Sequence, residues 1–383
     1  MFDSLVGFVR EQYRTKEFIP LHAPVFCGSE RKYVDETIQT TFVSSVGGFV
    51  DRFEQDVQRY TSSPRAVATV NGTAALHLAL MLAGVRAGEL VITQALTFVA
   101  TCNAIMYCGA SPVFIDVDRE TLGLSPAALE CWLDKNAYLN TDGACCYKDD
   151  DRVIRACIPM HTFGHPVKLD ELLAVCFRWN LIVVEDAAES LGSLYKGGHT
   201  GTFGQLGTLS FNGNKIITTG GGGMVLCSDE LGLRAKHLST TAKQAHAYEY
   251  IHDEVGYNYR LPNLNAALGC AQLEQLEKFV NAKRELAQRY ASFLKNSSLT
   301  FVLEPEGCQS NYWLNAVLCN DIKQRDSLLK ATNVVGVMTR PIWKLMTHLP
   351  MYSGCPRGPM INAEWLEDRI VNLPSSVPPE FFE

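Results

Sequence analysis

The chain has 383 residues, of which 47% are hydrophobic and 20% are charged, and its 41 acidic and 34 basic residues give a net charge of −7. This balance is typical of a globular protein and excludes a disordered or fibrous chain. The acidic charge, without any run of Lys and Arg, argues against nucleic acid or a membrane as the main partner.

The first two thirds of the chain predict an N-terminal segment and a large α/β domain. Residues 1–40 are expected to pack on the C-terminal domain or to lie across the mouth of the site. From about residue 60 to 228, apolar runs alternate with helical segments, which predicts a doubly wound, mostly parallel sheet within residues 41–230. The apolar runs are 66–70, 90–93, 113–117, 156–160, 181–186, 208–212 and 223–227.

After about residue 230 the pattern changes. Residues 261–296 have the spacing of one long or broken helix, which Pro262 opens. We therefore expect a smaller α+β domain over residues 231–383. Its other predicted elements are strands at 300–303, 312–318 and 336–339 and a helix near 323–331.

Polar residues follow the ends of the predicted strands. In open sheets of this kind, ligands bind at the carboxyl ends of the strands. These ends carry side chains able to form one site, namely residues 71–73, 97–98, His161, 185–186 and 212–215.

Lys215 follows one apolar run and precedes four consecutive glycines, Gly220 to Gly223. Lysine is rarely buried without reason, and glycines let the backbone approach a ligand closely. A lysine held there can form an imine with an aldehyde cofactor if its amine is accessible as the free base. A surface lysine beside a flexible turn is the alternative, and this segment alone favours it.

Asp186 ends the apolar run 181–186. Pyridoxal phosphate (PLP) accepts electrons only while its ring nitrogen stays protonated, which requires a carboxylate partner. An acid at a buried strand end suits this role, because opposite charges attract strongly in a low dielectric. A Mg²⁺ ligand or a helix cap is the alternative, and Asp186 by itself favours these.

Residues 71–75 lie at the junction of a strand and a helix. Backbone N–H groups at a helix N-terminus bind phosphate, and Gly72 allows a close approach. Thr73 and Ser210 can each add a hydroxyl, and Phe98 can stack on a pyridine ring. A ligand-free N-cap and a core Phe are the ordinary interpretations. Together with the lysine and the acid, however, these groups are the set that PLP chemistry requires.

Five motifs occur together, namely NGTAALHLAL, TFVATCNAI, SPVFIDVD, EDAAESLGS and SFNGNK. With them the chain resembles the DegT/DnrJ/StrS-type sugar aminotransferases, PLP enzymes of fold type I, from Ile19 to Trp343. The segment SFNGNKIITTGGGG resembles the LegC/PglE-like branch. The resemblance implies transamination of a UDP-4-keto-6-deoxy-N-acetylhexosamine with L-glutamate as amino donor, in routes to bacillosamine- or legionaminic-type sugars.

The resemblance assigns roles around the cofactor ring. Lys215 matches the Schiff-base lysine, Asp186 the partner of the pyridine nitrogen and Phe98 the stacking residue. Glu189 departs from many relatives, which have Gln or His near the phenolic oxygen of the cofactor. A carboxylate beside that oxygen is repelled unless it shares a proton. Glu189 is therefore expected in the site with an open role.

The resemblance also assigns phosphate contacts to Thr73, Ala74 and Ser210. Asn258 matches an asparagine that reaches the phosphate of the neighbouring subunit, although by itself it is an ordinary loop amide. The match implies a homodimer with composite active sites.

Substrate contacts are less strongly indicated. Arg340 can grip a carboxylate or phosphates with two hydrogen bonds, and Trp343 can cover a sugar or a base. A structural role is about as plausible for each of these residues. The remaining candidates are His348, His161, Ser44, Ser45 and Gly47.

Three other functions share features of this pattern. PLP-dependent sugar dehydratases have the same fold but carry histidine where Lys215 stands, and a non-catalytic PLP sensor would keep the pocket without turnover. A nicotinamide oxidoreductase lacks support because no G-x-G-x-x-G follows the first strand. The 13 cysteines, without a C-x-x-C pair or a leader, predict a reduced cytoplasmic protein, and no metal is expected.

Overall fold

The computed structural model describes residues 2–382 and contains a large seven-stranded sheet. Its strand order is β1-β11-β10-β7-β6-β2-β3, and all neighbours are parallel except those of β11, which is antiparallel to both β1 and β10. All seven predicted runs form these strands, so the predicted α/β fold is confirmed. The strands are β1 Arg65–Thr69, β2 Leu90–Gln94, β3 Ser111–Ile115, β6 Ile154–Ile158, β7 Ile182–Asp186, β10 Leu206–Ser210 and β11 Gly223–Cys227.

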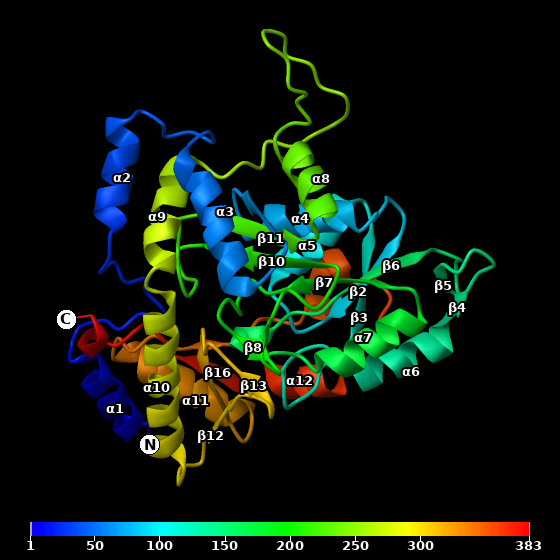
Figure 1. Ribbon diagram of the computed structural model, residues 1–383. Coiled ribbons are helices and arrows are strands. Elements are labelled where there is room, and N and C mark those ends of the chain that lie inside the picture. The colour runs from blue at the N-terminus through cyan, green and yellow to red at the C-terminus, as the bar shows by residue number, and fades with distance from the viewer. Residues whose placement is uncertain (1, 383) are drawn as a thin grey trace.

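Helices cover both faces of this sheet (Figure 1). Alternate residues of one strand point to opposite faces, and along β2 Val91 joins one apolar cluster while Leu90 and Ile92 join another. One face carries α4 Gly72–Leu82, α5 Val99–Tyr107 and α8 Asp229–Ser239, and the other carries α3 Gly48–Thr61, α6 Pro126–Asn136 and α7 Leu169–Arg178.

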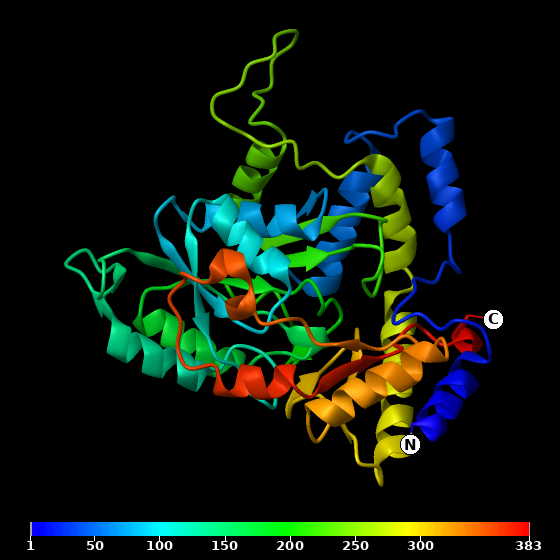
Figure 2. The same ribbon diagram turned by 180° about the vertical axis from the view of Figure 1, so that it is seen from behind.

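A second, antiparallel sheet has the order β12-β14-β16-β15. Its apolar side chains share a cluster with the helices α1, α10 and α11, and the N-terminus and C-terminus both lie in this part of the molecule (Figures 1 and 2). The elements are α1 Asp3–Tyr13, α10 Leu276–Leu294, β12 Thr300–Phe301, β14 Asn315–Leu318, α11 Ile322–Val334, β15 Arg340–Pro341 and β16 Ile370–Leu373.

The sequence placed domain boundaries at residues 40 and 230. Two helices that follow residue 230 nevertheless pack against the large domain. Helix α8 packs on α4 and β1, and α9 (Asn263–Leu273) packs on α3 and on α2 (Glu30–Gln39). The contacts favour a passage to the smaller sheet near α10. The predicted helix over 261–296 is broken between α9 and α10.

The chain crosses between the two sheets again near its C-terminal end. After β15 it returns to the edge of the large sheet, where Phe114 of β3 donates its N–H to Pro356 O at 2.9 Å and accepts one from Gly358 N at 2.9 Å. Helix α12 (Ile361–Glu367) then leads back to β16, and Figure 2 shows this orange-to-red segment bridging the two parts. None of the helices within residues 2–382 is long and apolar enough to span a membrane.

Short elements complete the fold away from these two sheets. A three-stranded sheet has the order β13-β8-β9, and a two-stranded one pairs β4 with β5. Their bounds, with those of the 3-10 helices, are β4 Ala137–Leu139, β5 Cys145–Tyr147, η1 Thr162–Gly164, β8 Leu194–Tyr195, β9 Gly198–His199, β13 Cys308–Gln309, η2 Met346–His348, η3 Pro350–Tyr352 and η4 Pro379–Phe381.

Candidate active site

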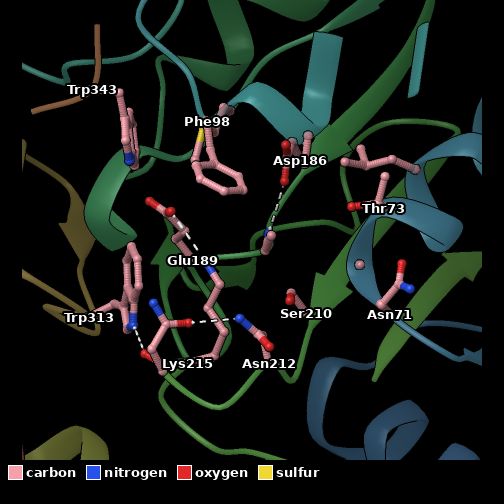
Figure 3. A pocket seen from close by; sticks show the side chains of 16 residues that line it. Asn71, Thr73, Phe98, Asp186, Glu189, Ser210, Asn212, Lys215, Trp313 and Trp343 are labelled. Atoms are coloured by element: carbon pink, nitrogen blue, oxygen red, sulfur yellow. Dashed lines mark hydrogen bonds and ion pairs between the residues drawn. The ribbon is translucent and has the colours of Figure 1, made fainter. Parts of the chain in front are cut away.

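A cavity of about 320 Å³ lies at the carboxyl ends of the strands of the large sheet and reaches segments from the smaller half (Figure 3). The structure brings to it six residues that the sequence analysis singled out, Thr73, Phe98, Asp186, Glu189, Ser210 and Lys215, together with Trp343 from the substrate candidates. The other lining residues are Asn71, Gly72, Leu76, Ala100, Met160, Ala188, Asn212, Asn214 and Trp313.

Lys215 extends its amine into this cavity from the loop after β10. A backbone hydrogen bond of 3.0 Å from its N–H to Asn212 O closes the turn that carries it. Its Nζ lies 3.2 Å from Glu189 Oε1 and 3.9 Å from the centroid of the Trp313 ring. The side chain is only 12% exposed, so the amine is held between a carboxylate and an aromatic face rather than in solvent.

Glu189 is buried beside this amine. Burial raises the pKa of its carboxyl group to about 7, against the opposing attraction of the Lys215 ammonium. The backbone N–H of Phe163 donates to its other oxygen, Oε2, at 3.0 Å. A carboxyl group with this pKa holds its proton for part of the time at neutral pH, so it can share a proton with the neighbouring amine.

Asp186 closes strand β7 at the base of the cavity and is 2% exposed. Its Oδ2 accepts from the Thr101 hydroxyl at 2.7 Å, and its Oδ1 accepts from Ala188 N at 3.2 Å. Burial nevertheless raises the pKa of this carboxyl group. A cationic group bound next to it would offset the cost of burial, and the protonated ring nitrogen of PLP is such a group.

The N-terminus of α4 supplies an anion site opposite Asp186. The first N–H groups of a helix have no acceptor within the helix, and here they point toward the cavity with the Thr73 hydroxyl. Gly72 is required at this place because a Cβ there would lie 2.9 Å from the Cβ of Ser210. The resulting cradle, with two hydroxyls and free N–H groups, fits a phosphate.

Ala74 does not line the cavity. Its N–H donates to Asn71 Oδ1 at 2.8 Å, because Asn71 caps the helix with its side chain. The Ala74 donor is thus used within the helix cap, while Gly72 and Thr73 line the cavity, and the phosphate contact of Ala74 stays a prediction.

Aromatic side chains form the remaining walls. Phe98, which is 48% exposed, lies edge-on to Trp343 with ring centroids 6.2 Å apart, and Trp343 contacts Phe163 at 5.3 Å. Figure 3 shows Phe98 above the amine of Lys215 and the rings of Trp313 and Trp343 along one side. This wall offers flat apolar surface to a pyridine ring or to a sugar.

His161 does not line the cavity, and its contact with substrate stays a prediction. It is completely buried, with Nε2 2.9 Å from Glu185 Oε2, while Nδ1 accepts from Val167 N at 3.3 Å. Both ring nitrogens are thus used. Glu185 also accepts from the backbone of residues 201, 203 and 204, so His161 completes a buried structural network.

Four more candidates lie outside this cavity. Asn258 is exposed and accepts from Arg260 Nε at 3.1 Å, in the long segment between α8 and α9 that projects from the molecule in Figure 1. His348 is exposed and its Nδ1 lies 3.1 Å from Glu367 Oε2. Arg340 and Ser44 are also exposed. This chain alone therefore does not bring them to the amine.

Sequence reasoning missed Trp313, which also lines the cavity. Asn212 and Asn214 belong to the segment 212–215 that the sequence placed in the site, and Asn212 Nδ2 donates to Asn214 Oδ1 at 3.3 Å. Trp313 had no local signal, because it lies 98 residues after Lys215 in a segment of the smaller half.

Comparisons with known proteins agree with this site. A sequence model of the DegT/DnrJ/EryC1/StrS aminotransferase family matches residues 27–378. The GDP-perosamine synthase of Escherichia coli O157:H7 is 37% identical over 360 residues, which cover 94% of this chain and 93% of that protein. The GDP-perosamine synthase of Vibrio cholerae is 34% identical over 366 residues, or 93% and 94%. The solved aminotransferase TlmJ from Streptoalloteichus hindustanus has a TM-score of 0.84 and 27% identity, over 94% of this chain and 93% of that one.

The mixed seven-stranded sheet, the cavity at its strand ends and these relatives together define a PLP-dependent aminotransferase. Amine, buried acid, phosphate cradle and aromatic wall are the donor set that this cofactor requires. The chain belongs to the DegT/DnrJ/EryC1/StrS aminotransferase family and is a sugar aminotransferase. The family and the cofactor expected from the sequence are thereby confirmed.

Proposed function

We propose that this enzyme transfers an amino group from L-glutamate to a nucleotide-linked 4-keto-6-deoxy-hexosamine, with UDP as the nucleotide. The observation that carries the proposal is the meeting of Lys215 Nζ, the Asp186 carboxylate and the Trp343 ring in one cavity. The motif SFNGNKIITTGGGG supports a UDP-linked N-acetylhexosamine of the LegC/PglE type. The names of the two relatives refer instead to a GDP-linked sugar, so the nucleotide is the point to test.

The roles of the residues follow from their chemistry. When bound, PLP supplies an aldehyde that bonds to amines and a protonated ring that accepts electrons. Asp186 keeps the ring nitrogen protonated, and Thr73 and Ser210 hold the phosphate. The Lys215 amine would take the α-proton of glutamate as a general base and then give it to the cofactor from the same face as a general acid. Glu189, 3.2 Å away, shares its proton with this amine.

The reaction then runs in two halves, and the same groups act in each. Glutamate leaves as 2-oxoglutarate before the keto sugar enters, and Lys215 moves the proton in the reverse sense during the second half. The flat ring of Trp343 at the cavity wall suits the apolar face of a hexose.

Asn258 supports a homodimer with composite sites. It is exposed at the base of the segment between α8 and α9, where it pairs with Thr240, and it does not line the cavity of its own chain. We expect it to reach the phosphate cradle of a partner subunit, where Arg340, His348 and Ser44 can also contribute. Mixing Asn258→Ala with Lys215→Ala should restore part of the activity through hybrid dimers, and a mixture that stays inactive would contradict this arrangement.

The decisive experiment compares Lys215→Ala with the wild-type enzyme on a panel of UDP- and GDP-linked 4-keto-6-deoxy sugars with glutamate, followed by mass spectrometry. We expect wild type to produce the UDP-linked amino sugar and Lys215→Ala to produce none. Turnover by Lys215→Ala would overturn the mechanism, and amination of GDP-linked sugars alone would overturn the UDP assignment. Loss of water without gain of nitrogen would instead identify a dehydratase, and no product with any donor a sensor.

A further inference from the structure

Trp313 has a fixed position that the proposed mechanism does not yet use. It is 4% exposed and lies just before β14. Its backbone N–H donates to Asn311 Oδ1 at 2.8 Å, its indole Nε1 donates to Asn214 O at 2.7 Å, and its carbonyl accepts from Lys283 Nζ at 3.2 Å. Two of these hydrogen bonds fix the backbone of Trp313, and the third fixes its ring.

The face of this ring is turned toward the amine of Lys215. The distance from Nζ to the ring centroid is 3.9 Å, well within the range of a cation–π contact. Glu189 approaches the same nitrogen at 3.2 Å, and Figure 3 shows the amine between these two side chains. Both neighbours attract an ammonium group more strongly than a neutral amine, because each presents negative charge to it.

The same segment also fixes the two loops that carry this pair. Asn214, which accepts the indole hydrogen bond, is the residue before Lys215. Asn311 donates from its side-chain nitrogen to Glu189 O at 3.0 Å and to Leu191 O at 2.8 Å. The short stretch from residue 311 to residue 313 therefore connects the smaller half to both loops that carry the amine and its carboxylate.

The side chain of Asn311 is tightly packed against Gly164. A Cβ at Gly164 would lie 1.9 Å from Asn311 Oδ1, so the glycine at that position allows the asparagine side chain to reach the loop of Glu189. Gly164 also has a φ of +98°, which favours glycine. This close packing holds the Asn311 side chain, which in turn accepts the backbone N–H of Trp313.

We propose that Trp313 is a positioning residue for Lys215, holding the amine over its ring face while the amine is free and charged, and fixing the lysine loop through its indole N–H. This inference rests on the proposed function, because it takes Lys215 as the lysine that bonds the cofactor. The lysine would leave the cofactor in the first half-reaction, would carry a proton in both halves, and would bond the cofactor again only at the end of the second. The ring keeps the freed amine inside the cavity during that interval.

The test uses two substitutions that separate the two contacts. Trp313→Phe keeps an aromatic face but removes the N–H donor, and Trp313→Leu removes both. Trp132→Phe is the matched control, because Trp132 is a buried tryptophan that stacks on Tyr147 far from Lys215 along the chain and outside the cavity. Cofactor-free protein is mixed with PLP, and the appearance of visible absorbance from bonding to lysine is followed as a function of pH.

Bonding requires the neutral amine, so the pH at half-maximal rate reports how strongly the folded protein holds the ammonium form. We expect Trp313→Leu to lower this pH by about 0.5 to 1 unit and to lower the limiting rate at high pH several-fold. Trp313→Phe should keep the midpoint within about 0.3 unit and lower only the limiting rate. Trp132→Phe should change neither.

Two outcomes separate this inference from the proposed function. If Trp313→Leu, shown by circular dichroism to be folded, has the midpoint and limiting rate of wild type, the positioning role is overturned. Should the leucine variant not fold, an unchanged limiting rate in Trp313→Phe overturns the role of the indole N–H. If Lys215→Ala still develops the absorbance, the proposed function itself fails, whatever the tryptophan variants show.

Discussion

Lys283 is a buried cation behind the active site, and its burial predicts how stability depends on pH. It lies on α10, is 0% exposed and donates to the carbonyls of Trp313 and Ser375. Within residues 2–382 it has no ion pair with a carboxylate. Burial lowers the pKa of this amine from 10.5 to about 7, because the charged form loses its hydration.

The size of the change in unfolding free energy follows from the difference in proton binding between the unfolded and the folded protein. Between pH 7 and 10.5 the unfolded chain keeps the proton on Lys283 while the folded protein has released it, so the free energy of unfolding rises with pH in this window. Each unit of pKa difference corresponds to about 1.36 kcal/mol, which gives about 3 to 4 kcal/mol between pH 7 and pH 10. Below pH 7 both states are protonated and the full cost of burying the charge remains.

Lys283→Met keeps the length of the side chain and removes the titrating group. It also leaves two buried carbonyls without a donor, at a cost of about 1 to 3 kcal/mol each. Urea denaturation at several pH values should therefore show wild type gaining about 3 to 4 kcal/mol over the variant from pH 7 to pH 10. A difference between the two proteins that stays constant to within about 1 kcal/mol over this range would refute the reasoning.

Three further substitutions test the surroundings of the cavity. As the pH rises from 4.5 to about 7, the unfolding free energy of wild type should fall by about 3 kcal/mol, because the folded protein keeps the Glu189 proton longer than the unfolded chain. Glu189→Gln should not show this fall. Urea titrations at pH 5 and 7.5 that show equal changes in both proteins would contradict this. Gly72→Val should weaken PLP binding at least 10-fold in a fluorescence titration, because its side chain would fill the phosphate cradle. His161→Ala should cost about 1 to 3 kcal/mol by removing one hydrogen bond from the buried Glu185, which keeps its backbone donors, with KM unchanged. A raised KM at wild-type stability would instead support His161 as a substrate contact.

Much of the fold could be predicted from the sequence because local patterns determine it. The run 181–186 became β7 Ile182–Asp186 and the run 223–227 became β11 with the same bounds, since strands covered on both faces must be continuously apolar. The strand expected at 336–339 is instead at Arg340–Pro341. Val337 forms a bridge with Ile19, a pairing between distant segments that no local pattern contains.

For the candidate site, too, some residues could be predicted from local patterns and others depend on tertiary packing. Lys215 and Asp186 follow strands of one sheet, so the rule for parallel strand ends predicted that they would share a cavity. His161 also follows a strand, yet it faces Glu185, and the need of a buried carboxylate for a partner is visible only once both side chains are placed. Trp313 reaches the cavity from the other sheet, and its position depends on how the two sheets pack together.

The edge of β3 illustrates what the double crossing of the chain does for the enzyme. Residues 356–358 pair with Phe114 at this edge, so its N–H and carbonyl are not available to a foreign strand. The chain connects residues 356–358 to the smaller half in both directions, through β15 before them and through α12 and β16 after them. Any movement of the smaller half away from the large sheet would have to break the two hydrogen bonds of Phe114.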